Sequence, residues 1–136
     1  MAEKIIARFI IQIAGKPEKN VVEALKLVET KLREHELFTV LESEVAEPEY
    51  DEETTLYSGF LDLEIRFPGP AELLGFVLDY TPNSVEIVEP QILKLEASEL
   101  TGIMNDMSSH LLRTSAKIRQ LSAQLHHVVK QGQEKK

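Results

Sequence analysis

Four segments of the chain alternate between apolar and polar residues or form short apolar runs. Residues 4–14 alternate with an isoleucine-rich face, and residues 56–67 alternate most regularly. Residues 38–45 and 85–88 are shorter runs of the same character. Because successive side chains of a strand point to opposite faces of a sheet, this period of two predicts four strands.

Two segments between these strands show the longer period of a helix. Apolar residues at steps of four, three and four predict an amphipathic helix that ends near residue 35: Val21, Leu25, Val28 and Leu32. A second helix is expected over residues 70–80, between the turn residues Pro68-Gly69 and the helix-breaking segment 81–84. Pro17 is acceptable in the first turn of the first of these helices, where its missing N–H is not needed.

The predicted order is strand, helix, strand, strand, helix, strand. This is the order of the split βαβ, or ferredoxin-like, sandwich, whose first and third strands are central. Here those two strands are the longest and the most apolar. We therefore expect a ferredoxin-like α+β domain over residues 1–90, followed by residues 91–97 as a linker or a short extra strand.

A long helix with a seven-residue repeat is predicted over residues 98–131, and residues 132–136 are expected to be disordered. Its repeating positions follow steps of four and three, which is the 3.5-residue period of a helix that packs on another helix. We expect these positions to form an oligomer interface, called the seam below: Leu100, Met104, Met107, Leu111, Thr114, Ile118, Leu121, Leu125 and Val128.

Small residues repeat every seven positions beside the seam, where charged residues are usual in a parallel zipper. One strip is Thr101, Ser108, Ser115 and Ser122, and its neighbour is Gly102, Ser109, Ala116 and Ala123. Small side chains allow helices to approach closely, which favours an antiparallel pair or a four-helix bundle. The alternative is that they form an ordinary exposed helix face.

The polar faces of the first and third predicted strands form a second candidate contact surface: Ile6, Arg8, Ile10, Phe60, Asp62 and Glu64. RNA-binding modules with this strand order stack bases on aromatic residues of these strands. Phe60 is the single aromatic residue of the face, and its two carboxylates would repel phosphate. We therefore expect a cross-strand pair of Arg8 with one of these carboxylates. We expect the face to be a subunit contact or the seat of the C-terminal segment, rather than a nucleic-acid surface.

The strand order also resembles that of the ACT-type ligand-binding regulatory domains. The resemblance rests on topology alone, and fold by itself does not define function. It implies a small-molecule ligand at a sheet or subunit interface, as the alternative to a protein-interaction module.

Charge is divided unevenly along the chain. Residues 1–106 carry 9 basic and 22 acidic side chains, whereas residues 107–136 carry 6 basic and 1 acidic. One interpretation is that the basic end lies on an acidic body, its own or that of another copy. The other is an anionic partner such as nucleic acid or a membrane surface. Six scattered bases form no dense patch, so we favour the first.

The sequence contains no cysteine, so disulfides, thiolate nucleophiles and cysteine metal sites are excluded. The first residues predict a strand rather than a signal peptide, and no apolar run reaches the 18 or so residues that span a bilayer. We therefore expect a cytoplasmic protein without membrane association.

No catalytic, cofactor or metal-binding motif is present. The acidic stretch 42–53 lacks the spacing of a calcium loop, the four histidines lack a metal-binding spacing, and the turn at residues 15–20 lacks a phosphate-binding glycine pattern. We expect no catalytic, cofactor or metal-ligating residue. An enzyme would need residues that are distant in sequence, such as His110 with the carboxylates of 42–53. The preferred hypothesis is a non-enzymatic module that forms a homo-oligomer or binds a protein partner.

Overall fold

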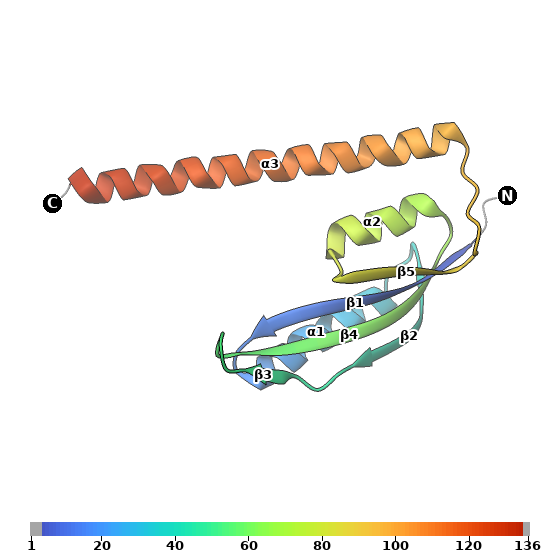
Figure 1. Cartoon of the computed structure of the whole chain (residues 1–136), viewed down its shortest axis with the longest axis horizontal. Helices are drawn as coiled ribbons and strands as arrows, with labels where there is room; N and C mark the ends of the chain where they lie inside the picture. Colours follow the sequence, from blue (N-terminus) through green and yellow to red (C-terminus); the bar gives the residue numbers. More distant parts are fainter. Residues whose placement is uncertain (1–3, 135–136) are drawn as a thin grey trace. The chain divides into compact units, whose positions relative to one another are not determined.

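The computed structural model describes residues 4–134 of the chain. It divides into two compact units, of which the first ends at Lys94 and the second begins at Leu95. Figure 1 labels the elements along the chain. They are β1 (Ile5–Gly15), α1 (Glu18–Arg33), β2 (Thr39–Val45), β3 (Glu49–Asp51), β4 (Leu56–Phe67), α2 (Pro70–Tyr80), β5 (Ser84–Glu89) and α3 (Ala97–Glu134).

The first unit contains one antiparallel sheet of five strands. Its strand order is β2-β4-β1-β5, and the short strand β3 pairs with β4 beside β2. The two long strands β1 and β4 are central and pair along their full lengths, from Ile5 opposite Phe67 to Gly15 opposite Tyr57. The mixed α+β class, the antiparallel sheet and the long C-terminal helix are thus confirmed.

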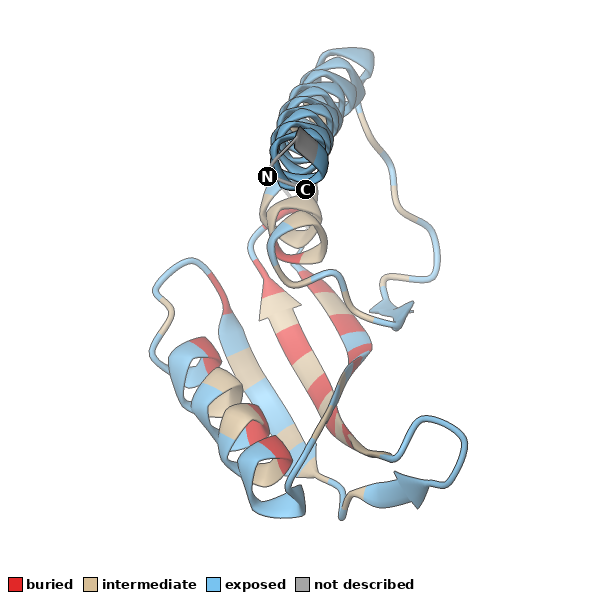
Figure 2. Ribbon diagram, turned by 90° about the vertical axis from the view of Figure 1, so that its left-hand side faces the viewer, coloured by how far each residue is buried: buried red, intermediate tan, exposed pale blue. Residues whose placement is uncertain are grey.

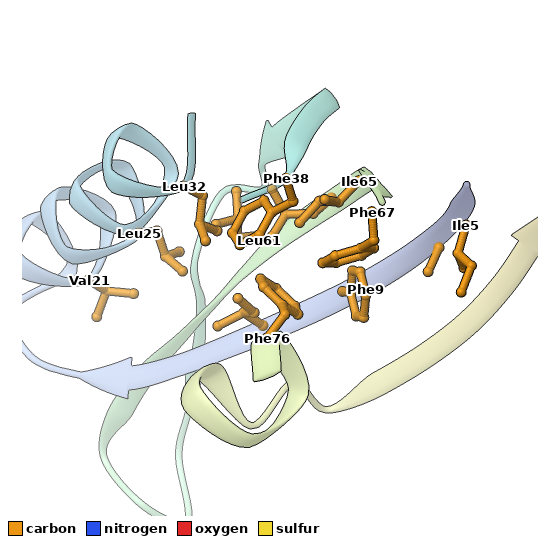
Figure 3. Close-up of a cluster of buried hydrophobic side chains, with 13 residues drawn as sticks. Ile5, Phe9, Val21, Leu25, Leu32, Phe38, Leu61, Ile65, Phe67 and Phe76 are labelled. Atoms are coloured by element: carbon orange, nitrogen blue, oxygen red, sulfur yellow. The ribbon is translucent and has the colours of Figure 1, made fainter. Parts of the chain in front are cut away.

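Helices α1 and α2 cover one face of this sheet. Alternate residues of the two central strands are buried beneath them, as Figure 2 shows by the banding of β1 and β4. Figure 3 shows the resulting core of aromatic and aliphatic side chains. Its largest fully buried side chains are Phe9, Phe67, Ile5, Leu25, Leu32, Leu61, Leu63, Ile65 and Val21. Burial of this apolar area provides most of the free energy that holds the unit together.

Aromatic rings fill the end of the core under α2. Phe76 of α2 lies with its ring centroid 4.4 Å from that of Phe9, and Phe9 meets Phe67 edge-to-face at 5.8 Å. Phe38, which precedes β2, packs against both Phe67 and Phe76. Such tilted and edge-to-face contacts are the preferred geometry of ring pairs, so they orient α2 on the sheet.

The acidic stretch 42–53 contains a short strand that the sequence pattern did not predict. Residues 49–51 form β3, in which Tyr50 lies opposite Tyr57 with 5.1 Å between the ring centroids. The alternation Glu49-Tyr50-Asp51 places the one ring toward its cross-strand neighbour. The many carboxylates of the stretch obscured this short strand in the sequence pattern.

The boundaries of the C-terminal region also differ in detail. Residues 91–96 form neither a strand nor a helix in the described chain, so the extra strand considered for 91–97 is absent. Helix α3 has 38 residues, against the predicted range 98–131. Of the tail expected to be disordered, residues 132–134 belong to α3, and residues 135–136 lie outside the described residues.

Candidate functional site

Helix α3 is one uninterrupted helix without a proline, drawn from orange to red in Figure 1. At about 1.5 Å per residue, its 38 residues extend about 57 Å. The eight apolar seam residues are 37% to 66% exposed, and Thr114 is exposed as well. A row of this length and exposure is a large apolar surface, which water covers at a free-energy cost.

The basic residues of α3 lie outside the seam. At 100° per residue, Lys117 falls about 80° from the centre of the seam, whereas Arg113, Arg119 and Lys130 fall more than about 100° from it, toward the far side of the helix. The helix therefore presents an apolar row without a base in it. Leu112 and Val129 are also exposed but lie outside the predicted seam residues, so the seven-residue pattern alone did not identify them.

The sheet face opposite α1 and α2 carries the second set of predicted residues. Ile6, Phe60, Asp62 and Glu64 are partly buried, whereas Arg8 and Ile10 are exposed. Arg8 lies opposite Glu64 in the register and forms an ion pair with Asp62, with 3.7 Å between Nη2 and Oδ2. The structure thus brings all six residues onto one face of the two central strands.

Strands β2 and β5 add further carboxylates to this open face. Glu42 lies directly opposite Glu64, and Glu44 lies directly opposite Asp62. Like charges in directly opposed positions destabilise a sheet. These residues line a shallow hollow of about 410 Å³ at the β2 edge together with Arg8 and Arg33. On the other side of the face, Glu86 lies opposite Arg8 and Glu89 lies opposite Ile6.

Carboxylates outnumber basic residues on the open face. The carboxylates of the face are Glu42, Glu44, Asp62, Glu64, Glu86 and Glu89, against the bases Arg8 and Arg66. Sequence reasoning found only those on the central strands, because the register of the edge strands decides which of their residues share this face. A phosphate backbone requires the opposite charge balance.

Histidine and carboxylate side chains were considered in the sequence for metal binding and for catalysis. Among residues 4–134, no group of three or more histidine and carboxylate side chains is arranged to hold a metal ion. His110 lies on α3 in the second unit, whereas the 42–53 carboxylates belong to the first. The combination considered for an enzyme is therefore not contained in one unit. His35 stacks on Phe38 with 4.3 Å between ring centroids.

A further cavity of about 270 Å³ lies on the helix-covered side of the first unit, where α2 meets the segment before β2. Its walls include Phe38, Phe76 and Tyr80. Sequence reasoning did not identify this cavity. The one available signal was Gly75, which interrupts the otherwise helix-favouring composition of residues 70–80.

Comparison with known proteins yields a family match. The model of the MJ0538 family matches residues 6–132, which include all the described elements from β1 almost to the end of α3. Neither a curated protein nor a solved structure matches the chain. In residues 4–134, no helix has the length and apolar character required to cross a membrane.

Proposed function

We propose that this chain, which belongs to the MJ0538 family, is a non-enzymatic module that self-associates through the seam of α3. The observation that carries the proposal is the exposed apolar row of α3, in which Leu111, Leu121 and Leu125 are 56%, 63% and 66% exposed. A second copy of the same helix offers a row of matching length and spacing. The work of the module would be to hold subunits, and whatever they bind, together.

The spacing of the row supports a helix as the partner. A helix that docks on a globular surface follows a period of 3.6 residues, whereas the seam keeps 3.5 residues over four heptads. Most helical stability in water comes from packing of an apolar face rather than from intrinsic propensity. Association would therefore both remove the seam from water and stabilise α3 itself.

The flanking residues bear on the kind of assembly. Ser108 and Ser115 occupy positions that usually carry complementary charges in a parallel zipper. Small residues permit a close antiparallel approach or a third and fourth helix, so we propose an antiparallel pair or a four-helix bundle. In an antiparallel pair centred on Ala116, Thr114 meets Ile118 and Leu111 meets Leu121.

The proposal also assigns a fold and a contact surface to the first unit. We infer that its strand order β2-β4-β1-β5, with α1 and α2 on one face, is that of a ferredoxin-like sandwich. Its open face carries Ile6, Ile10 and Phe60 beside the carboxylates and is proposed as a secondary subunit contact. A cytoplasmic location is also part of the proposal, because the cysteine-free sequence fits a reducing compartment.

The test is the mass of the full chain in solution, measured by sedimentation equilibrium over a range of concentrations. The double variant Leu111→Glu/Leu121→Glu buries two carboxylates in the proposed seam, so it is expected to sediment as a monomer where the parent is an oligomer. The matched control is Gln120→Glu/His127→Glu, which adds acidic side chains to a face of α3 away from both the seam and the small-residue strips. The control should keep the parent mass.

Two results would reject the proposal. One is a parent chain that remains monomeric at high micromolar concentration. The other is a seam variant that keeps the oligomeric mass of the parent, because the assembly would then use another surface. Far-ultraviolet circular dichroism of each variant reports whether α3 remains helical, so that loss of association can be separated from loss of the helix.

A further inference from the structure

The cavity beside α2 has walls of two kinds. One wall is aromatic and comprises Phe38, Phe76 and Tyr80, with the His35 ring stacked on Phe38. The other wall is the face of α2 that carries Gly75 and, one turn further on, Asp79. Phe38 and Phe76 are labelled at the centre of Figure 3, where they extend from different elements toward the same part of the core.

The aromatic wall is held by ring contacts. Phe76 and Tyr80 stack with 5.0 Å between centroids and 25° between their planes, and Phe38 meets Phe76 edge-to-face at 5.6 Å. These contacts leave a cavity of about 270 Å³, just below the roughly 300–1,000 Å³ of sites that bind drug-sized ligands. The cavity therefore suits a small molecule with a flat or short aliphatic body.

Two residues on the face of α2 toward this cavity, Gly75 and Asp79, lower the stability of the helix. Gly75 lies in the middle of α2, where glycine is less stable than alanine. A Cβ at Gly75 would meet no atom within 4 Å, so no neighbour in the described chain requires a glycine there. The missing side chain instead leaves room in the cavity and lets an occupant approach the helix backbone.

Asp79 is the second unfavourable residue on the same face. It lies in the last turn of α2, where the partial negative charge of the helix end disfavours a carboxylate. The ion pairs within residues 4–134 are Arg8–Asp62 and Lys19–Glu23, so Asp79 has no cationic partner there. Asp79 is exposed at the rim of the cavity, where its carboxylate is accessible to a bound cation.

We infer that this cavity binds a small organic cation, with its apolar body between Gly75 and the aromatic wall and its charged group at Asp79. Aromatic faces attract cations through the ring quadrupole, and a carboxylate adds a direct charge contact. The site lies within the first unit, so it does not depend on the proposed self-association through α3. It also differs from the interface ligand that the ACT-type topology implies.

The experiment titrates the full-length protein with 2-phenylethylammonium, and with neutral 2-phenylethanol and anionic phenylacetate as matched probes. Amide resonances of residues 75–80 are followed by ¹H–¹⁵N NMR. The inference predicts saturable shifts of these resonances with the cation at millimolar or lower concentration. Binding of the neutral and anionic probes should be about tenfold weaker or absent, because they lack the contact with Asp79.

The decisive variant is Gly75→Ala, which should change stability and binding in opposite directions. Alanine favours the helix, so the melting temperature should rise. Its methyl group enters the cavity, so cation binding should weaken about tenfold or more. Gly102→Ala on α3 is the matched control, because Gly102 is also helical with no atom within 4 Å of its Cβ and lies outside the cavity. That control should keep full cation binding.

The inference is overturned if the cation produces no saturable shift, or if all three probes bind equally well to the parent. It also fails if Gly75→Ala or Asp79→Asn binds the cation like the parent. Sedimentation of the same variants identifies one further contrary result. If Gly75→Ala lowers the oligomeric mass, the cavity is a contact for a second copy of the chain. The self-association proposal would survive that result, and the cation site would not.

Discussion

Gly59 of β4 and Leu25 of α1 lie so close that a Cβ on Gly59 would come within 2.7 Å of Leu25 Cδ1. The same Cβ would lie 2.8 Å from Cγ1 of Val21. Real Cβ atoms essentially never approach other atoms to these distances, so a side chain at residue 59 would force Leu25, Val21 or α1 itself to shift. The close packing of α1 on β4 at this point therefore uses the missing side chain of Gly59.

The first prediction follows from this contact. Gly59→Ala should lower the free energy of unfolding by about 1–3 kcal/mol, because α1 or its side chains must shift to admit the methyl group. Urea denaturation of the full chain measures the change. Gly15→Ala is the control, since its Cβ would lie at an ordinary 3.7 Å from Val21 Cγ2. Equal losses for the two variants would contradict the role assigned to Gly59.

At the end of α2, a substitution to glycine is expected to raise the free energy of unfolding. Thr81 caps this helix in the left-handed conformation, with φ 42° and ψ 60°. A side chain is strained there, so Thr81→Gly should raise the free energy of unfolding by about 0.5–1 kcal/mol, even after the greater flexibility of glycine in the unfolded chain is counted. Thr81→Ala keeps a Cβ and should gain much less. Thermal melts of the two variants make the comparison.

Thr114, the one polar residue of the seam, allows a test in which self-association is made stronger. Thr114→Leu should tighten self-association by about 1 kcal/mol per chain, because it adds apolar area at a position expected to be buried. The concentration dependence of the mass in sedimentation equilibrium measures this gain. Gln120→Leu adds apolar area to a face of α3 away from the seam and the small-residue strips, and it should leave the association constant unchanged. A gain from the Gln120 variant alone would place the contact on that other face.

Helix orientation can be determined with introduced cysteines, because the chain has none of its own. In an antiparallel pair Leu111 meets Leu121 of the other helix, whereas in a parallel pair Leu111 meets Leu111. Oxidation of a mixture of Leu111→Cys and Leu121→Cys chains should therefore yield mainly the mixed disulfide. Predominant Leu111→Cys homodimers on a non-reducing gel would show parallel helices instead.

Removal of a carboxylate from the open sheet face is expected to raise the stability of the first unit. Glu44 lies opposite Asp62, so Glu44→Gln should stabilise the first unit by about 0.2–1 kcal/mol. The gain should shrink at high salt, since exposed charges are screened within about 10 Å at 0.1 M ionic strength. Glu36→Gln, outside the sheet, is the control and should have a smaller effect. A Glu44 gain that does not vary with salt would rule out charge repulsion as its cause.

Much of the first unit could be predicted from local patterns. The strict alternation of residues 56–67 and of residues 4–14 identified the two strands that the structure places in the centre, and Pro70 marked the start of α2. The pairing of Arg8 with a carboxylate of β4 also followed from alternation, since both residues point to the polar face. These features depend on the side-chain periodicity of single segments, which a sequence displays directly.

Features that depend on the pairing of two different segments could not be predicted from the periodicity of either segment. The strand β3 forms through Tyr50 opposite Tyr57, and the opposition of Glu42 to Glu64 depends on the register of β2 on β4. The cavity at Gly75 arises where α2 meets the segment before β2. The sequence alone determined where the two helices of the first unit and its four longer strands form, and that α3 carries a seven-residue apolar repeat, because periodicity is a local property. Only the tertiary structure decided which carboxylates share a face and where a cavity remains, because these depend on register and on packing between elements far apart in the chain.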